Sequence, residues 1–291
     1  MRWHRAVSIR MCRNARLNPF FAAILTFALV GGGCSSSRIA TSGGRLRVMT
    51  WNVHHGEGID KKVDIERIAK LILSEKPDVV ALQEIDRGVE RSGKIDIITR
   101  LADLTDMTYA FGMTTDFQGG EYGNAFLTRF PILEERNLKY SLIRPGEQRG
   151  LLQLILDFRG EEIVVANTHL DQSDDAGRAS SVGELRSTLR AYSPRPIVVC
   201  GDFNDLPESQ VIADLRKNFE DSFGLVGRGE GFTYPSDAPN RRTDYILTLK
   251  NAKPDSATAA VHLQAMSARV LQSSASDHLP LLVEFELRTE R

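Results

Sequence analysis

The run Ile197-Val198-Val199-Cys200-Gly201-Asp202-Phe203-Asn204 is the most informative part of this chain, because four apolar residues lead directly into polar ones. A continuous apolar run of this kind is typical of a strand that is covered on both faces. Asp202 and Asn204 come just after the run, and ligand sites in open α/β folds form at strand ends. These eight residues therefore predict a buried sheet with a polar site at its edge.

Outward from this run, short apolar segments alternate with amphipathic ones. The segments that predict strands are 46–52, 79–83, 125–128, 151–158, 163–168, 197–200, 245–249 and 281–287. The segments that predict helices are 63–74, 95–104, 184–192 and 208–217. Pro207 suits the first turn of the last of these helices, and 227–240 is rich in loop residues. The pattern predicts an α/β fold of mixed strand order.

Polar residues gather at the ends of these predicted strands. They are Asn52, Glu84, His169, Asp202 and Asn204 at or just beyond a carboxyl end, Asp244 at the start of a strand, and Asp277 and His278 before the last strand. Any one of them has an ordinary explanation, since Asn and Asp are favoured in turns. Eight placed in this way predict a common site.

The composition of this set favours one kind of chemistry. Four carboxylates and two asparagine amides offer oxygen ligands, which suit hard cations such as Mg²⁺, Mn²⁺ or Ca²⁺. A metal so held can polarise a phosphoryl oxygen, while two histidines transfer protons or stabilise negative charge. His54 and His55 are adjacent, a poor spacing for two ligands on one ion, and no Cys/His grouping indicates zinc.

Other catalytic mechanisms fit the sequence poorly. The chain has no Gly-x-Ser-x-Gly elbow, no phosphate-cradling Gly-x-x-x-x-Gly-Lys-Ser/Thr loop and no internal repeat. Beyond Cys34 the only cysteine is Cys200, which excludes a disulfide within the domain and predicts a buried thiol.

The amino terminus is typical of an export signal. Five arginines without an acid precede the apolar run 20–30, and small residues then lead to Cys34. We expect 1–33 to be the signal, 34–45 a flexible tether anchored through an acylated Cys34, and 46–291 a single exported domain, with Met1 and Met11 both open as the start. Without the five leader arginines, 32 basic residues face 38 acidic ones, a net charge of −6, which disfavours bulk binding of nucleic acid.

Seven segments resemble the endonuclease/exonuclease/phosphatase superfamily, and they occur in the family order over nearly the whole predicted domain. They are Met49-Thr50-Trp51-Asn52, Pro77-Asp78-Val79-Val80-Ala81-Leu82-Gln83-Glu84, Gly123-Asn124-Ala125, Asn167-Thr168-His169-Leu170-Asp171, Gly201-Asp202-Phe203-Asn204, Thr243-Asp244-Tyr245-Ile246 and Ser276-Asp277-His278-Leu279-Pro280. The longer stretches at 52–56 and 119–125 look like a group of small bacterial members, many of them secreted. The resemblance implies a four-layer α/β/β/α sandwich: two mixed β-sheets packed face to face, helices outside, and the site where strand ends meet.

The resemblance also implies a role for each residue. Asn52 and Glu84 would hold Mg²⁺ or Mn²⁺, with Asp277 contributing directly or through water. Asp202 would orient or deprotonate the attacking water, and Asn204 would position it or the phosphate. His278, oriented by Asp244, would bond the phosphoryl oxygen or transfer a proton, with His169 doing similar work from the other side. Thr243 stands where the family commonly has an aliphatic residue, and we expect it to affect packing only.

The resemblance leaves the substrate open, because members of the superfamily act on nucleic acid, inositol phosphates or phospholipids. Lipid anchoring favours a small or lipid-derived phosphoester, a secreted nuclease is the alternative, and a non-catalytic binding protein of the same fold is less favoured. We expect a monomer. Five arginines lie near the motifs in sequence: Arg87, Arg91, Arg149, Arg241 and Arg242. We expect two or three of these five to reach the site.

Overall fold

The computed structural model describes residues 44–250 and 260–290. The predicted export signal (1–33), Cys34 and all but the end of the predicted tether lie outside these residues. The tether's last residue, Arg45, already pairs with Glu286 in a sheet. Within the described ranges, no helix is long and apolar enough to cross a membrane.

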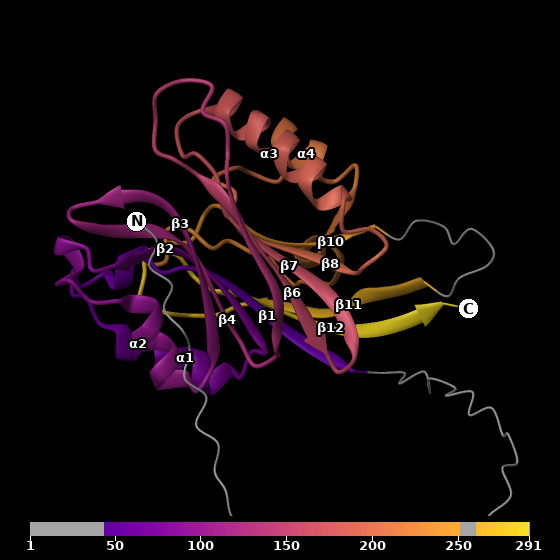
Figure 1. Cartoon of the computed structure of the whole chain (residues 1–291), viewed down its shortest axis with the longest axis horizontal. Helices are drawn as coiled ribbons and strands as arrows, with labels where there is room; N and C mark the ends of the chain where they lie inside the picture. Colours follow the sequence, from indigo (N-terminus) through magenta and orange to yellow (C-terminus); the bar gives the residue numbers. More distant parts are fainter. Residues whose placement is uncertain (1–43, 251–259, 291) are drawn as a thin grey trace, which may run out of the picture. The chain divides into compact units, whose positions relative to one another are not determined.

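Two six-stranded sheets form the centre of the domain (Figure 1). The first has the order β11-β12-β1-β2-β4-β3, in which only β1 and β2 run parallel. Its strands are β1 (Arg45–Asn52), β2 (Val79–Arg87), β3 (Thr108–Phe117), β4 (Gly120–Thr128), β11 (Ala260–Val270) and β12 (Leu281–Glu290).

The second sheet has the order β5-β6-β7-β8-β10-β9, and its single parallel pair is β7 with β8. Its strands are β5 (Ile132–Lys139), β6 (Gly150–Phe158), β7 (Glu161–His169), β8 (Ile197–Asp202), β9 (Phe219–Asp221) and β10 (Asp244–Leu249). Both sheets are therefore mixed, with a parallel pair inside.

Three apolar clusters separate four layers. One lies between the sheets and includes Val48, Phe126 and Val198, whereas a second, with Met49 and Trp51, lies between the first sheet and its helices. A third packs the second sheet against its own helices. Side chains alternate between the faces of a strand, so β1 contributes to two clusters. The predicted α/β/β/α sandwich of two packed mixed sheets is confirmed.

The helices cover the outer faces: α1 and α2 lie on the first sheet, and α3 and α4 on the second (Figure 1). The α-helices are α1 (Ile65–Glu75), α2 (Ile97–Thr105), α3 (Asp175–Arg190), α4 (Gln210–Leu215) and α5 (Ser222–Val226), and the 3₁₀ turns are η1 (His54–Gly56) and η2 (Glu90–Ser92). Helix α1 shows how the sequence sets such an element. Asp64 caps its first turn by accepting from Arg67 N, and Ile65, Ile68 and Ile72 are buried along one face.

The sequence missed elements with weak apolar patterns. Strands β3 and β5 lie at sheet edges and are largely exposed or half-buried, so they carry no continuous apolar run. Strands β9 and β11 were missed too. Helix α3 begins at Asp175, earlier than predicted, because its first turns are built from small and polar residues. Helix α4 begins at Gln210 with Ser209 as its cap, so Pro207 lies before the helix and not in its first turn.

A buried polar link joins the two sheets just beneath their strand ends. Gln83 Nε2 donates to Asn167 Oδ1 at 2.7 Å, and Asn167 Nδ2 donates to the carbonyls of Leu82 and Ala125, each at 2.8 Å. Gln83 and Asn167 are fully buried, so these bonds compensate for lost hydration. The link fixes how the carboxyl ends of the parallel strands face each other.

Candidate active site at the strand ends

The second sheet places three predicted site residues side by side. His169 pairs with Asp202 across the parallel strands β7 and β8, and Asp202 pairs with Asp244 across β8 and β10. Gly201 makes this possible, because a Cβ there would lie only 2.0 Å from the carbonyl oxygen of Thr168. The site is thus centred on Asp202.

The first sheet contributes Asn52 and Glu84 from the ends of its parallel pair. Asn52 is the last residue of β1, and Glu84 lies in an irregularity of β2 where Leu82 pairs with Ala125 but Ile85 pairs with Gly123. Such a bulge redirects a side chain, and Glu84 has a left-handed φ of 59°. Asn52 Nδ2 donates to Glu84 Oε1 at 3.0 Å and to Asp202 Oδ2 at 3.1 Å, so one amide connects the two sheets.

His278 lies between two aspartates. Its Nδ1 donates to Asp244 Oδ2 at 2.9 Å, and its Nε2 lies 3.6 Å from Asp202 Oδ2. Trp51 Nε1 donates to the backbone carbonyl of His278 at 2.9 Å, and the Tyr234 ring packs against the imidazole with centroids 4.6 Å apart. The predicted orientation of His278 by Asp244 is present in the structure.

His169 lies on the other side of Asp202, with its Nε2 3.6 Å from Asp202 Oδ2. Arg149 Nη1 lies 2.8 Å from His169 Nδ1, and since a guanidinium only donates, Nδ1 accepts. Asn204 donates its backbone N–H to Asp202 Oδ1 at 2.9 Å, and its side-chain Nδ2 lies 3.0 Å from His169 Nε2 and donates to the carbonyl of Leu170 at 3.0 Å. The predicted members His169, Asp202 and Asn204 are therefore in direct contact.

The surroundings give the two histidines different charge states. Burial and then the charge of Arg149 lower the pKa of His169 well below its usual value. Burial would also lower the pKa of His278, but the carboxylates of Asp244 and Asp202 outweigh it and raise that pKa. At neutral pH His169 is uncharged and His278 is a cation. The cation can donate to an oxyanion, and both can donate hydrogen bonds.

The carboxyl groups of Asp202 and Glu84 differ in the direction of their pKa shifts. Burial is the largest influence on Asp202 and raises the pKa of its carboxyl, with the charge of His278 opposing it. A carboxylate with a raised pKa is a better general base near neutral pH. Burial acts in the same direction on Glu84, but the neighbouring histidines and Asn52 more than offset it and lower the pKa. Glu84 is thus ionised and suited to hold a cation.

Asp277 lies at the rim of the site, with its side chain 37% exposed. Its Oδ1 is 3.9 Å from His54 Nδ1 and accepts a hydrogen bond from Ser276 Oγ at 3.3 Å. The structure therefore brings all eight predicted residues to one region, with Asp277 the most exposed of the predicted metal ligands.

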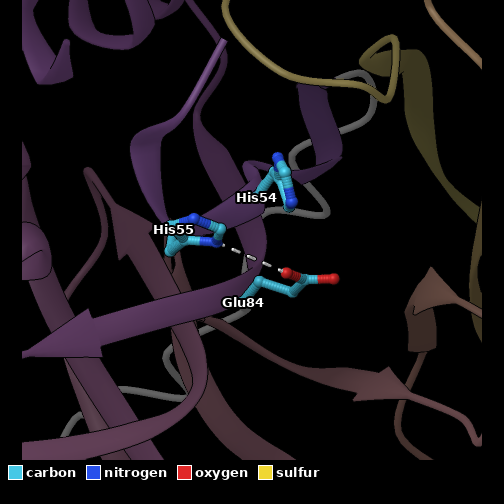
Figure 2. Close-up of side chains that lie close together, drawn as sticks. All are labelled: His54, His55 and Glu84. Atoms are coloured by element: carbon cyan, nitrogen blue, oxygen red, sulfur yellow. Dashed lines mark ion pairs between the residues drawn. The ribbon is translucent and has the colours of Figure 1, made fainter. Parts of the chain in front are cut away.

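The structure adds to two expectations about neighbouring residues. His54 and His55 were expected to be poorly spaced as two ligands of one ion, and one ring nitrogen of each and one carboxylate oxygen of Glu84 lie within 4.8 Å of one another. Figure 2 shows both rings beside this carboxylate. The reason is η1, where His54 and His55 have left-handed φ of 45° and 44°. Thr243 was expected to affect packing only, but its hydroxyl donates to Asp244 Oδ2 at 3.1 Å.

A cavity of about 520 Å³ opens over the site, a size typical of small-ligand pockets. Among the predicted residues it reaches Asn52, Glu84, His169, Asp202, Asn204, Asp277 and His278. Three of the five arginines considered reach it, as expected: Arg91, Arg149 and Arg241. Arg87 instead pairs with Asp96 and Glu121, and Arg242 pairs with Asp221. The sequence missed Phe117, Tyr122 and Tyr234 in the lining, because nothing local distinguishes them from core aromatics.

The fold and this site define a class of hydrolases in which acidic and histidine clusters line a cleft between two packed sheets. The chain matches the model of the Endonuclease/Exonuclease/phosphatase family over residues 49–278, and it belongs to that family. Over 258 residues it is 29% identical to protein YbhP of Escherichia coli K12, covering 83% of this chain and 96% of the relative.

Solved structures share the fold. The human Nocturnin catalytic domain with a bound sulfate anion matches with a TM-score of 0.67 and 22% identity, covering 84% of this chain and 94% of that domain. The mannosyl-6-phosphatase Bt3783 of Bacteroides thetaiotaomicron matches with a TM-score of 0.67 and 18% identity, covering 82% of this chain and 99% of the other. The family description covers endonucleases, exonucleases and phosphatases, and membership supports a hydrolase.

Proposed function

We propose that this chain is a divalent-metal-dependent phosphoesterase that hydrolyses a small or lipid-derived phosphomonoester or phosphodiester. The observation that carries the proposal is the position of Asp202 between two histidines, one neutral and one cationic. Its Oδ2 lies 3.6 Å from Nε2 of both His169 and His278. This arrangement joins a base for water with a cationic hydrogen-bond donor, His278, for a phosphoryl group.

The side chains divide the work by position. Asp202 accepts the proton of the attacking water, and Asn204 holds that carboxylate through its backbone N–H. His278, kept protonated by Asp244, donates to a phosphoryl oxygen as negative charge develops there. His169 stays neutral, with Arg149 donating to its Nδ1 and with its Nε2 facing Asp202 and the Asn204 amide. Groups held in this way need little rearrangement in the transition state.

The residues present fit a divalent cation. Glu84 is ionised, and Asp277 at the rim adds carboxylate oxygens. Asn52 adds an amide oxygen, which accepts a hydrogen bond from His54 N at 3.0 Å. Oxygen donors of this kind suit Mg²⁺ or Mn²⁺. When bound, the ion would polarise the phosphoryl group and stabilise the leaving oxygen. Glu84, Asn52 and Asp277 would hold it.

The cavity supports a compact, anionic substrate. Arg91, Arg149 and Arg241 line it, and guanidinium groups bind phosphate oxygens in pairs. The acidic balance of the predicted mature domain disfavours a long nucleic acid. The name of Bt3783 describes a phosphatase acting on a phosphorylated sugar, which is in keeping with a small phosphoester here.

The test is a substrate panel. Bis-p-nitrophenyl phosphate, inositol phosphates, phospholipids and plasmid DNA are incubated with the purified domain after chelation and with added Mg²⁺ or Mn²⁺, beside the variant Asp202→Asn. We expect cleavage of small or lipid phosphoesters, lost with EDTA and in the variant. Full activity after chelation would contradict metal dependence. Preferential cleavage of DNA would favour the nuclease alternative. No hydrolysis of any substrate would favour a non-catalytic binding protein.

We further propose that the chain is exported, held at the membrane through an acyl chain on Cys34, and monomeric. The support is the basic and apolar leader before Cys34, in residues outside the described ranges. Cys34→Ser should shift the protein from the membrane fraction to the soluble envelope fraction. An unchanged membrane fraction would count against acylation. Light scattering after size-exclusion chromatography measures the molar mass in solution and so tests whether the protein is a monomer.

A further inference from the structure

We infer that Arg91 and Phe117 form a subsite that selects phosphoesters whose alcohol is a neutral polyhydroxy compound, of the sugar or polyol kind. The inference rests on the proposed function and names the substrate class of the same cavity. It makes Arg91 and Phe117 specificity-determining residues, which contact the alcohol and leave the phosphoryl group to the catalytic residues.

The lining of the cavity disfavours an apolar alcohol. Within the described part of the chain, no alanine, valine, leucine, isoleucine or methionine lines it. Its apolar surface comes mainly from three aromatic rings, those of Phe117, Tyr122 and Tyr234. Cavities that bind small molecules are usually lined for the most part by hydrophobic side chains. An acyl chain gains free energy by moving from water to such a surface, which is small here. The cavity therefore fits an alcohol with many polar groups.

Arg91 and Phe117 lie together in the lining. Arg91 is in η2, just after β2, and Phe117 is the last residue of β3. The Cζ atom of Arg91 lies 4.8 Å from the centroid of the Phe117 ring and 5.4 Å from that of Tyr122, and the backbone N–H of Arg91 donates to Gln118 Oε1 at 3.0 Å. In the described residues, neither Arg91 nor Phe117 bonds or stacks with Asp202 or a catalytic histidine. The pair thus borders the reaction centre without belonging to it.

The charge of Arg91 is already compensated. Its Nε and Nη2 donate to Oδ2 and Oδ1 of Asp86, both at 2.9 Å, and the Asp86 side chain is fully buried. A bidentate pair of this kind fixes the orientation of the guanidinium. Burial on its own would lower the pKa of Arg91, but the hydrogen bonds and charge of Asp86 raise it, with smaller contributions from Tyr122 and Glu84. Arg91 therefore offers little net charge to a second anionic group and acts mainly as a hydrogen-bond donor.

The free part of this guanidinium matches a hydroxyl group. The side chain of Arg91 is 28% exposed, and no hydrogen bond among the described residues uses its Nη1. A guanidinium nitrogen only donates, so Nη1 can bind a hydroxyl oxygen. Thr115 also lines the cavity, and its Oγ1 donates to the carbonyl of Asp116 at 3.3 Å. That oxygen can still accept. A donor and an acceptor together suit hydroxyl groups, which do both.

Phe117 supplies a surface for the carbon skeleton. It is 37% exposed, whereas most large apolar residues of the domain are buried. The face of an aromatic ring carries partial negative charge and attracts weakly positive C–H groups, such as those on the face of a sugar ring. An alkyl alcohol could contact the same ring but would leave Arg91 Nη1 and Thr115 Oγ1 without partners. The subsite therefore distinguishes the two alcohols by their hydroxyl groups.

The experiment compares two alcohols of the same shape. Glucose 6-phosphate and cyclohexylmethyl phosphate both join a ring to the phosphate through one methylene, but only the first carries hydroxyl groups. Each is supplied with Mg²⁺ as the monoester and as the methyl diester, and the ester type that is hydrolysed is compared. The proteins are wild type, Arg91→Lys, Phe117→Leu and the control Arg159→Lys, whose guanidinium lies over Phe158. Arg91→Lys keeps a cation beside Asp86 but loses the fixed planar donors.

We expect wild-type kcat/KM to be at least about tenfold higher for the hydroxylated alcohol, because a site that bonds a substrate hydroxyl discriminates against the analogue that lacks it. Arg91→Lys and Phe117→Leu should each reduce this ratio at least about threefold, and Arg159→Lys should retain it. Equal kcat/KM for the two alcohols in the wild type, or an unchanged ratio in either cavity variant, would overturn the inference. The wild-type comparison gives a result even if a variant does not fold.

Binding to the variant Asp202→Asn separates this inference from the proposed function. Calorimetry measures the Kd of both esters without turnover. Equal hydrolysis of both alcohols would overturn the subsite and leave the phosphoesterase. Tighter binding of glucose 6-phosphate, without hydrolysis of any ester by the wild type, would support the subsite and contradict the phosphoesterase. Neither binding nor hydrolysis would overturn both.

Discussion

Asp244 and His278 form a buried pair, in which His278 Nδ1 donates to Asp244 Oδ2 at 2.9 Å. Asp244 is fully buried and His278 is 6% exposed, so the bond is shielded from water. The carboxylate fixes which imidazole nitrogen faces Asp202 and the cavity.

This pair should act as one catalytic unit. Asp244→Asn and His278→Ala should each lower kcat by about 10²- to 10⁴-fold, the usual cost of losing a well-placed proton donor. The double variant should be little worse than His278→Ala, because residues of one unit are not additive. Steady-state kinetics beside thermal melts check this. Lowered melting temperatures with near-native kcat would mean that the pair is only structural.

Thr243 should contribute to the same unit. Thr243→Val removes the hydroxyl that donates to Asp244 Oδ2 while keeping the shape of the side chain. One hydrogen bond is worth about 1 kcal/mol, so kcat should fall by up to about tenfold, much less than for Asp244→Asn. Thr248→Val is a matched control, since Thr248 is also buried in β10. Equal kcat in both variants would show that the Thr243 hydroxyl does not matter.

Acid should weaken the domain through Asp221. Burial on its own would raise the pKa of Asp221, but hydrogen bonds and charge from Arg242 and Arg216 lower it below 3.8. A carboxyl with a lowered folded-state pKa stabilises the protein above its unfolded-state pKa, and this stabilisation is lost as pH falls through the folded-state value. The free energy of unfolding should therefore decrease below about pH 4.

The variant Asp221→Asn separates this carboxyl from others that titrate in acid. It leaves the buried Arg242 without its bidentate partner, so it should lose about 3–5 kcal/mol at neutral pH. The difference from wild type should narrow as pH falls below about 4, because wild type then loses the stabilisation of its ionised carboxylate and the variant has none to lose. Urea denaturation across this range measures it. A constant difference at all pH values would remove Asp221 from the acid transition.

Asn167 should hold the two sheets in their mutual position. Asn167→Leu removes one of the hydrogen-bond acceptors of Gln83 and the buried donor to the carbonyls of Leu82 and Ala125, at a cost of about 1–3 kcal/mol in the free energy of unfolding. Asn137→Leu is the control, because Asn137 is exposed and bonds a single carbonyl. Urea unfolding measures the free energy of unfolding of both variants. A smaller loss of this free energy in Asn167→Leu than in the control would contradict the role of the link between the sheets.

Much of the site could be read from the chain because its elements are local. Continuous apolar runs mark buried strands, and Asn52, His169 and Asp202 are the last residues of three of them. A residue at the carboxyl end of a strand stays there whatever the order of strands in the sheet. These residues can therefore be assigned to the site without knowledge of the topology. Edge strands such as β3 and β5 were missed because half-exposed strands need no apolar run.

Other relationships exist only in three dimensions. The position of Asp202 between His169 and His278 depends on strand pairing and on the packing of the loop before β12 against Trp51, which joins residues 227 apart in sequence. The partnership of His169 with Arg149 likewise depends on the register of β6 and β7. His54 and His55 converge on Glu84 only because the backbone is left-handed at all three. Residue type and spacing specify which groups are present and where strands end, whereas side-chain direction follows from φ and ψ and from contacts between distant segments.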